Sequence, residues 1–384
     1  MPSTEQPVSA RAARLQVRRL LLLALADPAA ALTLPPESLD LTIRLLRRAQ
    51  LLGRFAARVA AAGMLERLPP PLPDLLESAL VNARTRARVG LWELDRIAWA
   101  MEETPLVPLV AMKGCAYLLA GTPNAEGRNF GDVDLLAAET DLATVEQVLH
   151  EHGWHGAEVS AYDDYYYRHW AHELPPLSHR ERGVEVDLHH NIVMRTARLK
   201  VAADKLMAAS RPVADSRFRV LAPVDMCLHA TTHLMYSGEM EDGLRELVDV
   251  ADLLTHFGQR EPDFWRDFWP RAAELQLARP AWYAVRHANR LLGAPVPAEA
   301  IAEGDRHGPP AAMRALMDRL ITNALFPPHP DMPDSDSGAA RLLLFMRQHW
   351  VRMPPLMLAR HLSTKAWFRL REARAGDAPA GSRV

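Results

Sequence analysis

Two aspartates, Asp132 and Asp134, are separated by one apolar residue in an otherwise hydrophobic segment. Side chains alternate between the two faces of a strand, so a strand over residues 132–137 would present both carboxylates on the same face. Like charges this close repel, and the arrangement is costly unless a cation lies between them. The spacing therefore predicts a cation site.

A second acidic segment lies at residues 184–189. Apolar and polar residues alternate in it, which places Glu185, Asp187 and His189 on one face of a strand. A neighbouring strand could therefore bring a third carboxylate, from Asp187 or Glu185, to the same cation. Carboxylates on a rigid sheet suit Mg²⁺ or Mn²⁺, and such ions hold a nucleoside triphosphate and activate an incoming hydroxyl.

The order of these motifs resembles a known family. The chain reads Lys113-Gly114, then Arg128, then Gly131-Asp132-Val133-Asp134, and then Asp187-Leu188-His189. This order is similar to the uncharacterised bacterial nucleotidyltransferases of the DNA polymerase beta-like superfamily, and the likeness covers roughly residues 85 to 260. The resemblance implies that Asp132, Asp134 and Asp187 are the catalytic metal ligands. It favours Asp187 over Glu185 because the family places its third acid directly before Leu-His.

The resemblance also implies which residues contact the nucleotide, namely Lys113, Gly114, Arg128 and Gly131. In the superfamily a Gly-Ser or Gly-Gly pair opens a helix and contacts the triphosphate. Here the corresponding place reads Lys113-Gly114 followed by Cys115, so the small hydroxyl residue is missing. An ammonium group near a helix N-terminus is well placed to meet phosphate oxygens, and we expect Lys113 to compensate.

The helices and strands that must position these residues are predicted from the spacing of hydrophobic residues and from the glycines and prolines that interrupt it. We expect a buried strand over 106–112, a helix over 114–120, a loop over 121–127 and a helix over 140–152 capped by Asp141. Residues 165–177 and 184–192 are expected to form a hairpin around a turn at 178–183. Strand, helix, strand, helix and hairpin make the minimal core of the resembled superfamily.

The whole chain is expected to be α+β, with a small mixed-sheet nucleotidyltransferase core between N-terminal and C-terminal helical regions. The predicted divisions are listed here in order: an N-terminal helical region over 1–100, the core over 101–222, a helical domain over 223–330, and residues 331–384. The last of these combines a linker at 331–338, a basic helical arm and a tail, disordered from about residue 375.

Composition bounds the function. The 384 residues carry a formal net charge of −2, so there is no global basic field, which argues against general nucleic-acid binding. Only Cys115 and Cys227 are present, without CxxC spacing, which fits a reducing cytoplasm. No segment approaches the roughly 20 apolar residues of a membrane span, and residues 20–26 are expected to lie in a buried or amphipathic helix.

Three other groups of residues, two histidines, a charged helix face and an aromatic segment, allow both a functional and a structural interpretation. His229 and His233 lie one helical turn apart and could bind a metal, although packing is favoured because no HExxH pattern is present. Arg245, Asp249 and Asp252 share a helix that resembles the one closing the nucleotide cleft in this family; a solvated helix face is the alternative. Five aromatic residues between 162 and 170 suggest base stacking, with core packing favoured.

The predicted function is metal-dependent transfer of a nucleoside monophosphate from a nucleoside triphosphate, ATP being the first expectation, to a hydroxyl group. The acceptor stays open between a small molecule and a protein, and a tRNA end is not excluded. Removing any one of the three carboxylates is expected to stop this reaction and leave the fold intact. The alternative is a catalytically degenerate binding or assembly module in a biosynthetic or toxin-antitoxin system, which the altered Gly-Ser element favours.

Overall fold

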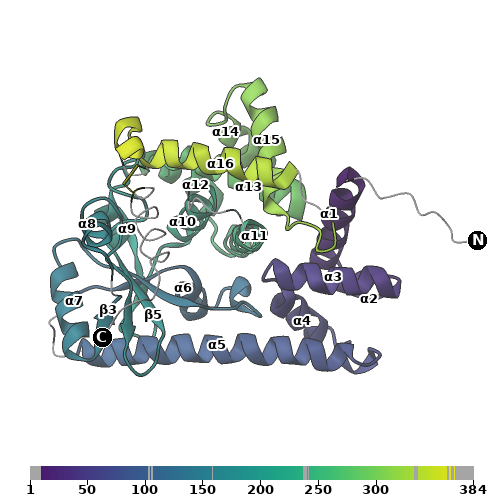
Figure 1. Cartoon of the computed structure of the whole chain (residues 1–384), viewed down its shortest axis with the longest axis horizontal. Helices are drawn as coiled ribbons and strands as arrows, with labels where there is room; N and C mark the ends of the chain where they lie inside the picture. Colours follow the sequence, from purple (N-terminus) through teal and green to yellow (C-terminus); the bar gives the residue numbers. More distant parts are fainter. Residues whose placement is uncertain are drawn as a thin grey trace, which may run out of the picture.

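The computed structural model describes residues 10–360 apart from 103, 105–106, 158, 237–239, 241 and 333–335, together with 363, 364 and 367. Figure 1 shows a mixed sheet at one end of the molecule and helices packed below, above and beside it. The predicted α+β class is confirmed. Across the described ranges no helix combines the length and apolar character needed to cross a membrane.

The N-terminal region is helical, as predicted. Its helices are α1 (Ala10–Ala26), α2 (Pro28–Leu32), α3 (Pro36–Arg48), α4 (Leu52–Ala61), the 3₁₀ turn η1 (Leu65–Arg67) and α5 (Leu72–Ala100). Leu20, Leu21 and Ala24 are buried in α1, so the apolar run there is part of the core. Helix α5 is 29 residues long and runs beneath both the N-terminal helices and the sheet (Figure 1).

A buried carboxylate attaches α5 to the far edge of the sheet. Glu93, in the C-terminal third of α5, is fully buried; it accepts a 2.7 Å hydrogen bond from Trp154 Nε1 and pairs with Arg182 at 2.8 Å. A buried charge with a partner at each oxygen is satisfied, whereas an unpaired one would be costly. The long helix therefore serves as a fixed base for the strands.

The sheet within the described residues has seven strands in the order β3-β4-β5-β2-β1-β7-β6. These are β1 (Val110–Ala111), β2 (Asp132–Leu136), β3 (Trp154–Gly156), β4 (Leu177–His179), β5 (Glu185–His189), β6 (Arg211–Pro212) and β7 (Arg219–Val220). The central pair, β2 and β5, is parallel, and its register places Asp134 opposite Asp187 and Asp132 opposite Glu185. Both acidic patterns therefore lie on the same face of the sheet.

The helices of the core are α6 (Lys113–Ala120), η2 (Pro123–Ala125), α7 (Leu142–Glu151), α8 (Ala161–His169) and α9 (Ala203–Ala209). Asp141 occupies the N-cap of α7, but its side chain makes no capping hydrogen bond. The first predicted strand is mostly irregular: β1 covers two residues, and residues 105–106 lie outside the described ranges.

The predicted hairpin is wrong in its first half, because α8 occupies residues 161–169 and the strand that pairs with β5 is the short β4. Ser160 caps α8 by accepting a hydrogen bond from the Asp163 backbone amide. Asp164 and Arg168 pair one turn apart at 3.0 Å, with the acid toward the N-terminus, where the helix dipole favours it. Cap and charge order outweigh the β preference of the tyrosines.

The remaining helices are α10 (Pro223–Tyr236), α11 (Gly243–Arg260), α12 (Phe264–Glu274), α13 (Ala278–Leu292), α14 (Ala298–Asp305), α15 (Ala311–Leu325) and α16 (Asp336–Arg352). One cluster of buried hydrophobic residues extends from Val17 to Met353, so the helical regions and the sheet share a continuous core. The four predicted domain divisions stay predictions.

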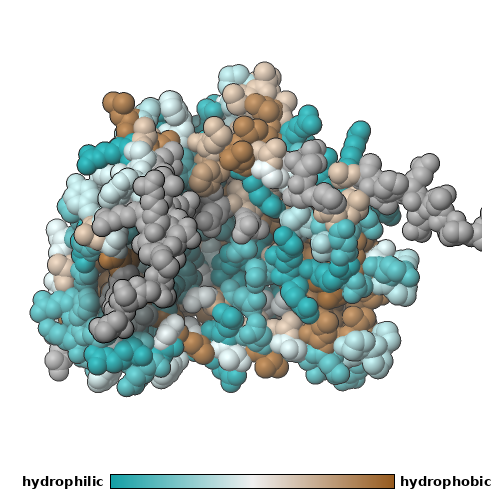
Figure 2. All heavy atoms as spheres, viewed as in Figure 1, coloured by the Kyte–Doolittle hydropathy of each residue, from teal (hydrophilic) through white to brown (hydrophobic). Residues whose placement is uncertain are grey.

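The C-terminal arm differs from its predicted form. Helix α16 begins at Asp336, inside the predicted linker, and it packs along α15 at the top of Figure 1. Besides arginines it exposes five large apolar side chains, from Leu342, Leu343, Phe345, Met346 and Trp350. Hydrophobic atoms gather over α15 and α16 in Figure 2. The tail predicted from about residue 375 lies outside the described residues.

Two glycines allow the N-terminal helices to contact the core at backbone distance. Gly53 lies in α4 and Gly127 precedes Arg128; a Cβ atom added to Gly127 would lie 2.4 Å from the Gly53 carbonyl oxygen. Gly127 also has a φ of +70°, which L side chains rarely adopt. A side chain at either position would overlap the backbone of the other segment, so both positions require glycine.

We expect Gly127→Ala to lower the free energy of unfolding by about 3 kcal/mol, through steric overlap with Gly53 added to backbone strain. Gly63→Ala is the matched control, because Gly63 has a φ of +65° but no atom within 4 Å of its would-be Cβ. That variant should lose only about 1 kcal/mol. Urea denaturation measures both, and equal losses would show that the backbone contact contributes nothing.

Candidate functional site

Asp134 is the central charge of the site. Its carboxylate is 1% exposed and accepts hydrogen bonds from Lys113 Nζ at 2.6 Å and from His189 Nε2 at 3.0 Å. Burial acts to raise the pKa of Asp134, but the Lys113 charge and the His189 hydrogen bond hold it well below its ordinary value. Asp134 is therefore ionised, and its charge is already compensated.

Lys113 is held at the start of α6 in a conformation uncommon for its type. Its φ is +44°, a backbone strain of the kind found at functional sites. Burial acts to lower the pKa of Lys113, but the carboxylates of Asp134 and Asp132 keep it above its ordinary value. Lys113 therefore carries its positive charge next to two of the predicted metal ligands.

Asp187 has the opposite electrostatic environment. Burial and the negative charges of Asp134 and Glu173 raise its pKa to about 7. Lys113 and His189 donate hydrogen bonds to Asp134, and neither donates one to Asp187. A carboxylate crowded by other carboxylates suits a site where a cation supplies the missing charge.

The third predicted ligand, Asp132, lies apart from the other two. Within the described part of the chain, Asp134, Asp187 and His189 form one group whose potential ligand atoms lie within 4.8 Å of one another, and Asp132 is not in it. Asp132 is the exposed first residue of β2 and lines a neighbouring cavity. The structure therefore places Asp134 and Asp187 together and Asp132 at the edge.

That neighbouring cavity has a volume of about 160 Å³. It is lined by all four residues predicted to contact the nucleotide: Lys113, Gly114, Arg128 and Gly131. Arg245, Glu246 and Asp249 line it from α11, so the helix expected to close the cleft does lie against it. The cavity combines three cationic side chains and a helix N-terminus, which favour anionic groups, with the carboxylates of Asp132, Glu246 and Asp249.

Gly114 and Cys115 show how the altered Gly-Ser element is accommodated. A Cβ atom on residue 114 would lie 2.5 Å from the Phe130 ring, so only glycine fits. Cys115 is buried, and burial together with the charges of Asp134 and Asp132 raises its pKa to about 12. The thiol is therefore neither a nucleophile nor a substitute for an exposed hydroxyl.

Arg128 connects the core to α11. Its Nε lies 3.1 Å from Asp249 Oδ2, and its guanidinium stacks over the Tyr117 and Phe130 rings. Burial acts to lower the pKa of Arg128, but Asp249 keeps it above its ordinary value. Arg128 is thus a fixed positive charge in the cavity wall and also a structural contact.

The two histidines of α10 line the same cavity. His229 is buried, and burial holds its pKa well below the ordinary value. His233 Nδ1 lies 3.2 Å from Glu246 Oε2, and the two imidazole centroids are 6.4 Å apart. Neither belongs to a group of three potential ligands within the described ranges.

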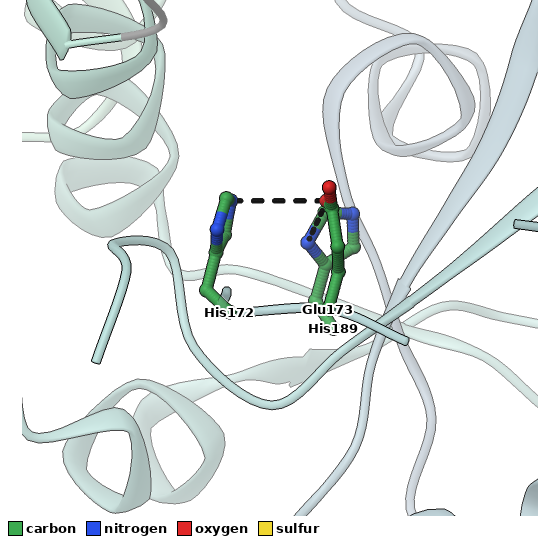
Figure 3. Close-up of side chains that lie close together, drawn as sticks. All are labelled: His172, Glu173 and His189. Carbon is green, nitrogen blue, oxygen red and sulfur yellow. Dashed lines mark ion pairs between the residues drawn. The ribbon is translucent and has the colours of Figure 1, made fainter. Parts of the chain in front are cut away.

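No sequence motif points to His172 and Glu173, which lie between α8 and β4. Glu173 forms a β-bridge with His189, and its Oε2 lies 3.3 Å from His189 Nδ1 and 3.8 Å from His172 Nε2 (Figure 3). The only signal was an adjacent His and Glu after an aromatic segment. Their meeting with His189 depends on a long-range pairing that no local pattern encodes.

A second cavity, of about 460 Å³, opens beside Asp187. His172 and Glu173 line it, together with tyrosines of α8 and α10 and with Arg352 of α16. Two of the predicted stacking residues, Tyr166 and Tyr167, are in this wall. Lys113 and His233 line both cavities, so the two adjoin at these side chains.

Comparison with known proteins agrees with the resemblance seen in the motifs. A protein-family profile described as "Uncharacterised nucleotidyltransferase" matches residues 35–293. A search of curated proteins finds no significant match. The matched range includes both acidic strands, Lys113, Arg128 and the helix that bears Asp249, and it covers more than half of the chain. The chain therefore belongs to the uncharacterised nucleotidyltransferase family.

Proposed function

We propose that the chain transfers a nucleoside monophosphate from a nucleoside triphosphate, with ATP as first candidate, to a hydroxyl group. The hydroxyl oxygen attacks the α-phosphorus, the bond to the β-phosphate breaks, and pyrophosphate leaves. The observation that carries this proposal is the parallel pairing that sets Asp187, in the wall of the larger cavity, beside Asp134, which binds the Lys113 side chain that lines both cavities. Such reactions depend mainly on positioning and electrostatics.

The donor set fits Mg²⁺ or Mn²⁺. Asp134 and Asp187 offer carboxylate oxygens within one group, and Asp132 lies on the same face of β2. Hard divalent ions prefer such oxygen ligands. When bound, the ion would offset phosphate charge and activate the hydroxyl. Asp132, Asp134 and Asp187 would hold it.

The phosphates fit the smaller cavity. Lys113 lies at the start of α6, and Arg128 and Arg245 supply two further positive charges in its wall. These side chains would bind the triphosphate and offset the charge that develops on the leaving pyrophosphate. The volume of about 160 Å³ suits the phosphates and leaves the nucleoside outside.

The acceptor fits the larger cavity. Asp187 lines it and would orient the acceptor hydroxyl and accept its proton. The tyrosines offer apolar faces with polar tips, and Arg352 lies in the same wall. A small molecule or a protein side chain of about that volume would satisfy these contacts.

One observation favours the alternative, a binding module without activity. Lys113 and His189 both donate to Asp134, so an internal cation already balances the charge that a metal ion would otherwise balance. The two proposals differ in an assay with each α-³²P-labelled nucleoside triphosphate, Mg²⁺ and a cell extract. Label should enter an acceptor with the wild-type chain and not with Asp187→Asn. A module would transfer no label with either.

Nucleoside triphosphate and divalent ion should bind together. We expect calorimetry to show that removing Mg²⁺ with a chelator weakens ATP binding at least tenfold, because uncompensated phosphate charge would face Asp132 and Asp187. Glu185 is an exposed acid two residues from Asp187 on the same strand, and Glu185→Gln should bind ATP like the wild type. Equal ATP affinity with and without Mg²⁺ would refute the metal assignment.

A further inference from the structure

His189 lies between two carboxylates, and its two ring nitrogens are not equally satisfied. Nε2 donates to Asp134 Oδ1 at 3.0 Å, while Nδ1 faces Glu173 Oε2 at 3.3 Å. The ring is 2% exposed, and its Nδ1 is buried without a hydrogen bond to any described residue. A neutral imidazole that donates through Nε2 presents a lone pair at Nδ1. A lone pair and a carboxylate this close require a positive charge between them.

A second imidazole converges on the same oxygen. His172 Nε2 lies 3.8 Å from Glu173 Oε2; in Figure 3 the His172 ring stands apart from the Glu173 carboxylate, which overlaps the His189 ring in that view. Protons on His189 Nδ1 and on His172 Nε2 would account for the two approaches separately, but 3.8 Å is beyond hydrogen-bond distance for the second. A metal ion would satisfy both.

The spacing fits metal ligation. His172, Glu173 and His189 each offer one atom, and these atoms lie within 4.8 Å of one another. Ligands about 2.05 Å from a tetrahedral ion lie about 3.4 Å apart, and the two distances here are 3.3 and 3.8 Å. We infer that His172, Glu173 and His189 bind a borderline divalent transition metal such as Zn²⁺.

The donor set separates this ion from the one proposed at the aspartates. Two imidazole nitrogens and one carboxylate suit Zn²⁺ and its neighbours, whereas Mg²⁺ prefers oxygen. Three protein ligands also leave a coordination position for water or a ligand hydroxyl. His172 and Glu173 line the larger cavity, so that position has access to its contents.

The surroundings support a preformed site. The His190 amide donates to the His172 carbonyl at 2.9 Å, and the Leu174 amide donates to the Leu188 carbonyl at 2.9 Å, so the backbone fixes both ligand segments. Asp134 accepts from the other nitrogen of His189, the carboxylate-histidine arrangement that orients metal-bound imidazoles. This inference needs no nucleotide and stands whether or not the chain transfers one.

The test measures Zn²⁺ binding by the metal-free full-length chain, using calorimetry and elemental analysis after dialysis. We expect one equivalent of Zn²⁺ that excess Mg²⁺ does not displace. His172→Gln and Glu173→Gln should each weaken Zn²⁺ binding roughly a hundredfold or more. His169→Gln, three residues away on the exposed end of α8, should bind like the wild type. Circular dichroism of each metal-free variant verifies that it is folded.

Three outcomes would overturn the inference. One is no stoichiometric Zn²⁺ binding, which would assign the charge between His189 and Glu173 to a proton. Another is unchanged binding by a folded His172→Gln or Glu173→Gln variant. The third is loss of Zn²⁺ in Asp187→Asn with retention in His172→Gln, which would place the ion with Asp134 and Asp187 instead.

Discussion

Replacing Asp134 with asparagine is expected to stop nucleotidyl transfer and also to destabilise the fold. The neutral amide lacks the charge that the proposed reaction needs, which should slow the chemical step by about a hundredfold or more, or about 3 kcal/mol. The same change would leave the Lys113 ammonium without its anionic partner in a largely buried position. Removing one member of a buried pair costs about 3–5 kcal/mol. Lys113 is 23% exposed, so we expect about 2 kcal/mol.

Asp132→Asn is the matched control for Asp134→Asn. Asp132 lies two residues away on the same strand but is exposed. It should lose activity and keep its stability. Urea denaturation in the presence of a chelator compares the two variants without metal. If both unfold at the same urea concentration as the wild type, the Lys113 pair does not stabilise the chain.

Asp187→Asn is expected to slow the chemical step by a similar factor and to raise the stability of the fold. The pKa of Asp187 is raised to about 7 by burial and by Asp134 and Glu173, so the folded chain favours the protonated acid. In the unfolded chain the same group ionises near pH 4. Asp187 therefore destabilises the metal-free fold progressively as pH rises from about 4 to 7, and fully above pH 7. Asparagine removes this penalty.

We expect metal-free Asp187→Asn to be more stable than the wild type by about 1 kcal/mol or more at pH 8, with the difference shrinking toward pH 4. Thermal or urea unfolding across this range measures it. Glu185→Gln is the control on the same strand; it should keep most activity and show no pH-dependent gain. A loss of stability in Asp187→Asn at pH 8 would mean that this carboxylate is structural.

The sequence predicted the acidic face because its evidence is local. A period of two fixes that Asp132 and Asp134 share a face, and the same period places Glu185 with Asp187. The motifs give no reason to distinguish the three aspartates, so an intact fold is predicted for each asparagine variant. The structure separates them, since Lys113 binds only Asp134 and no local pattern specifies which carboxylate a side chain 21 residues away will meet.

Two other errors have different origins, one local and one long-range. The tyrosine-rich segment favours a strand by residue preference, but the Ser160 cap and the Asp164 to Arg168 pair make it helical. Glu173 reaches His189 through a bridge between segments that are distant in sequence. Capping and charge order therefore account for the first error, and long-range pairing accounts for the second.

The ammonium of Lys113 belongs to the walls of both cavities, and this would make the two proposed ligands thermodynamically dependent on each other. A phosphate that draws Lys113 away from Asp134 changes the charge presented to whatever occupies the other side, and an occupant there changes the charge presented to the phosphate. Linkage requires that the two effects be equal in free energy. The two proposed substrates would then change each other's affinity by the same factor through one side chain, without any movement of the strands.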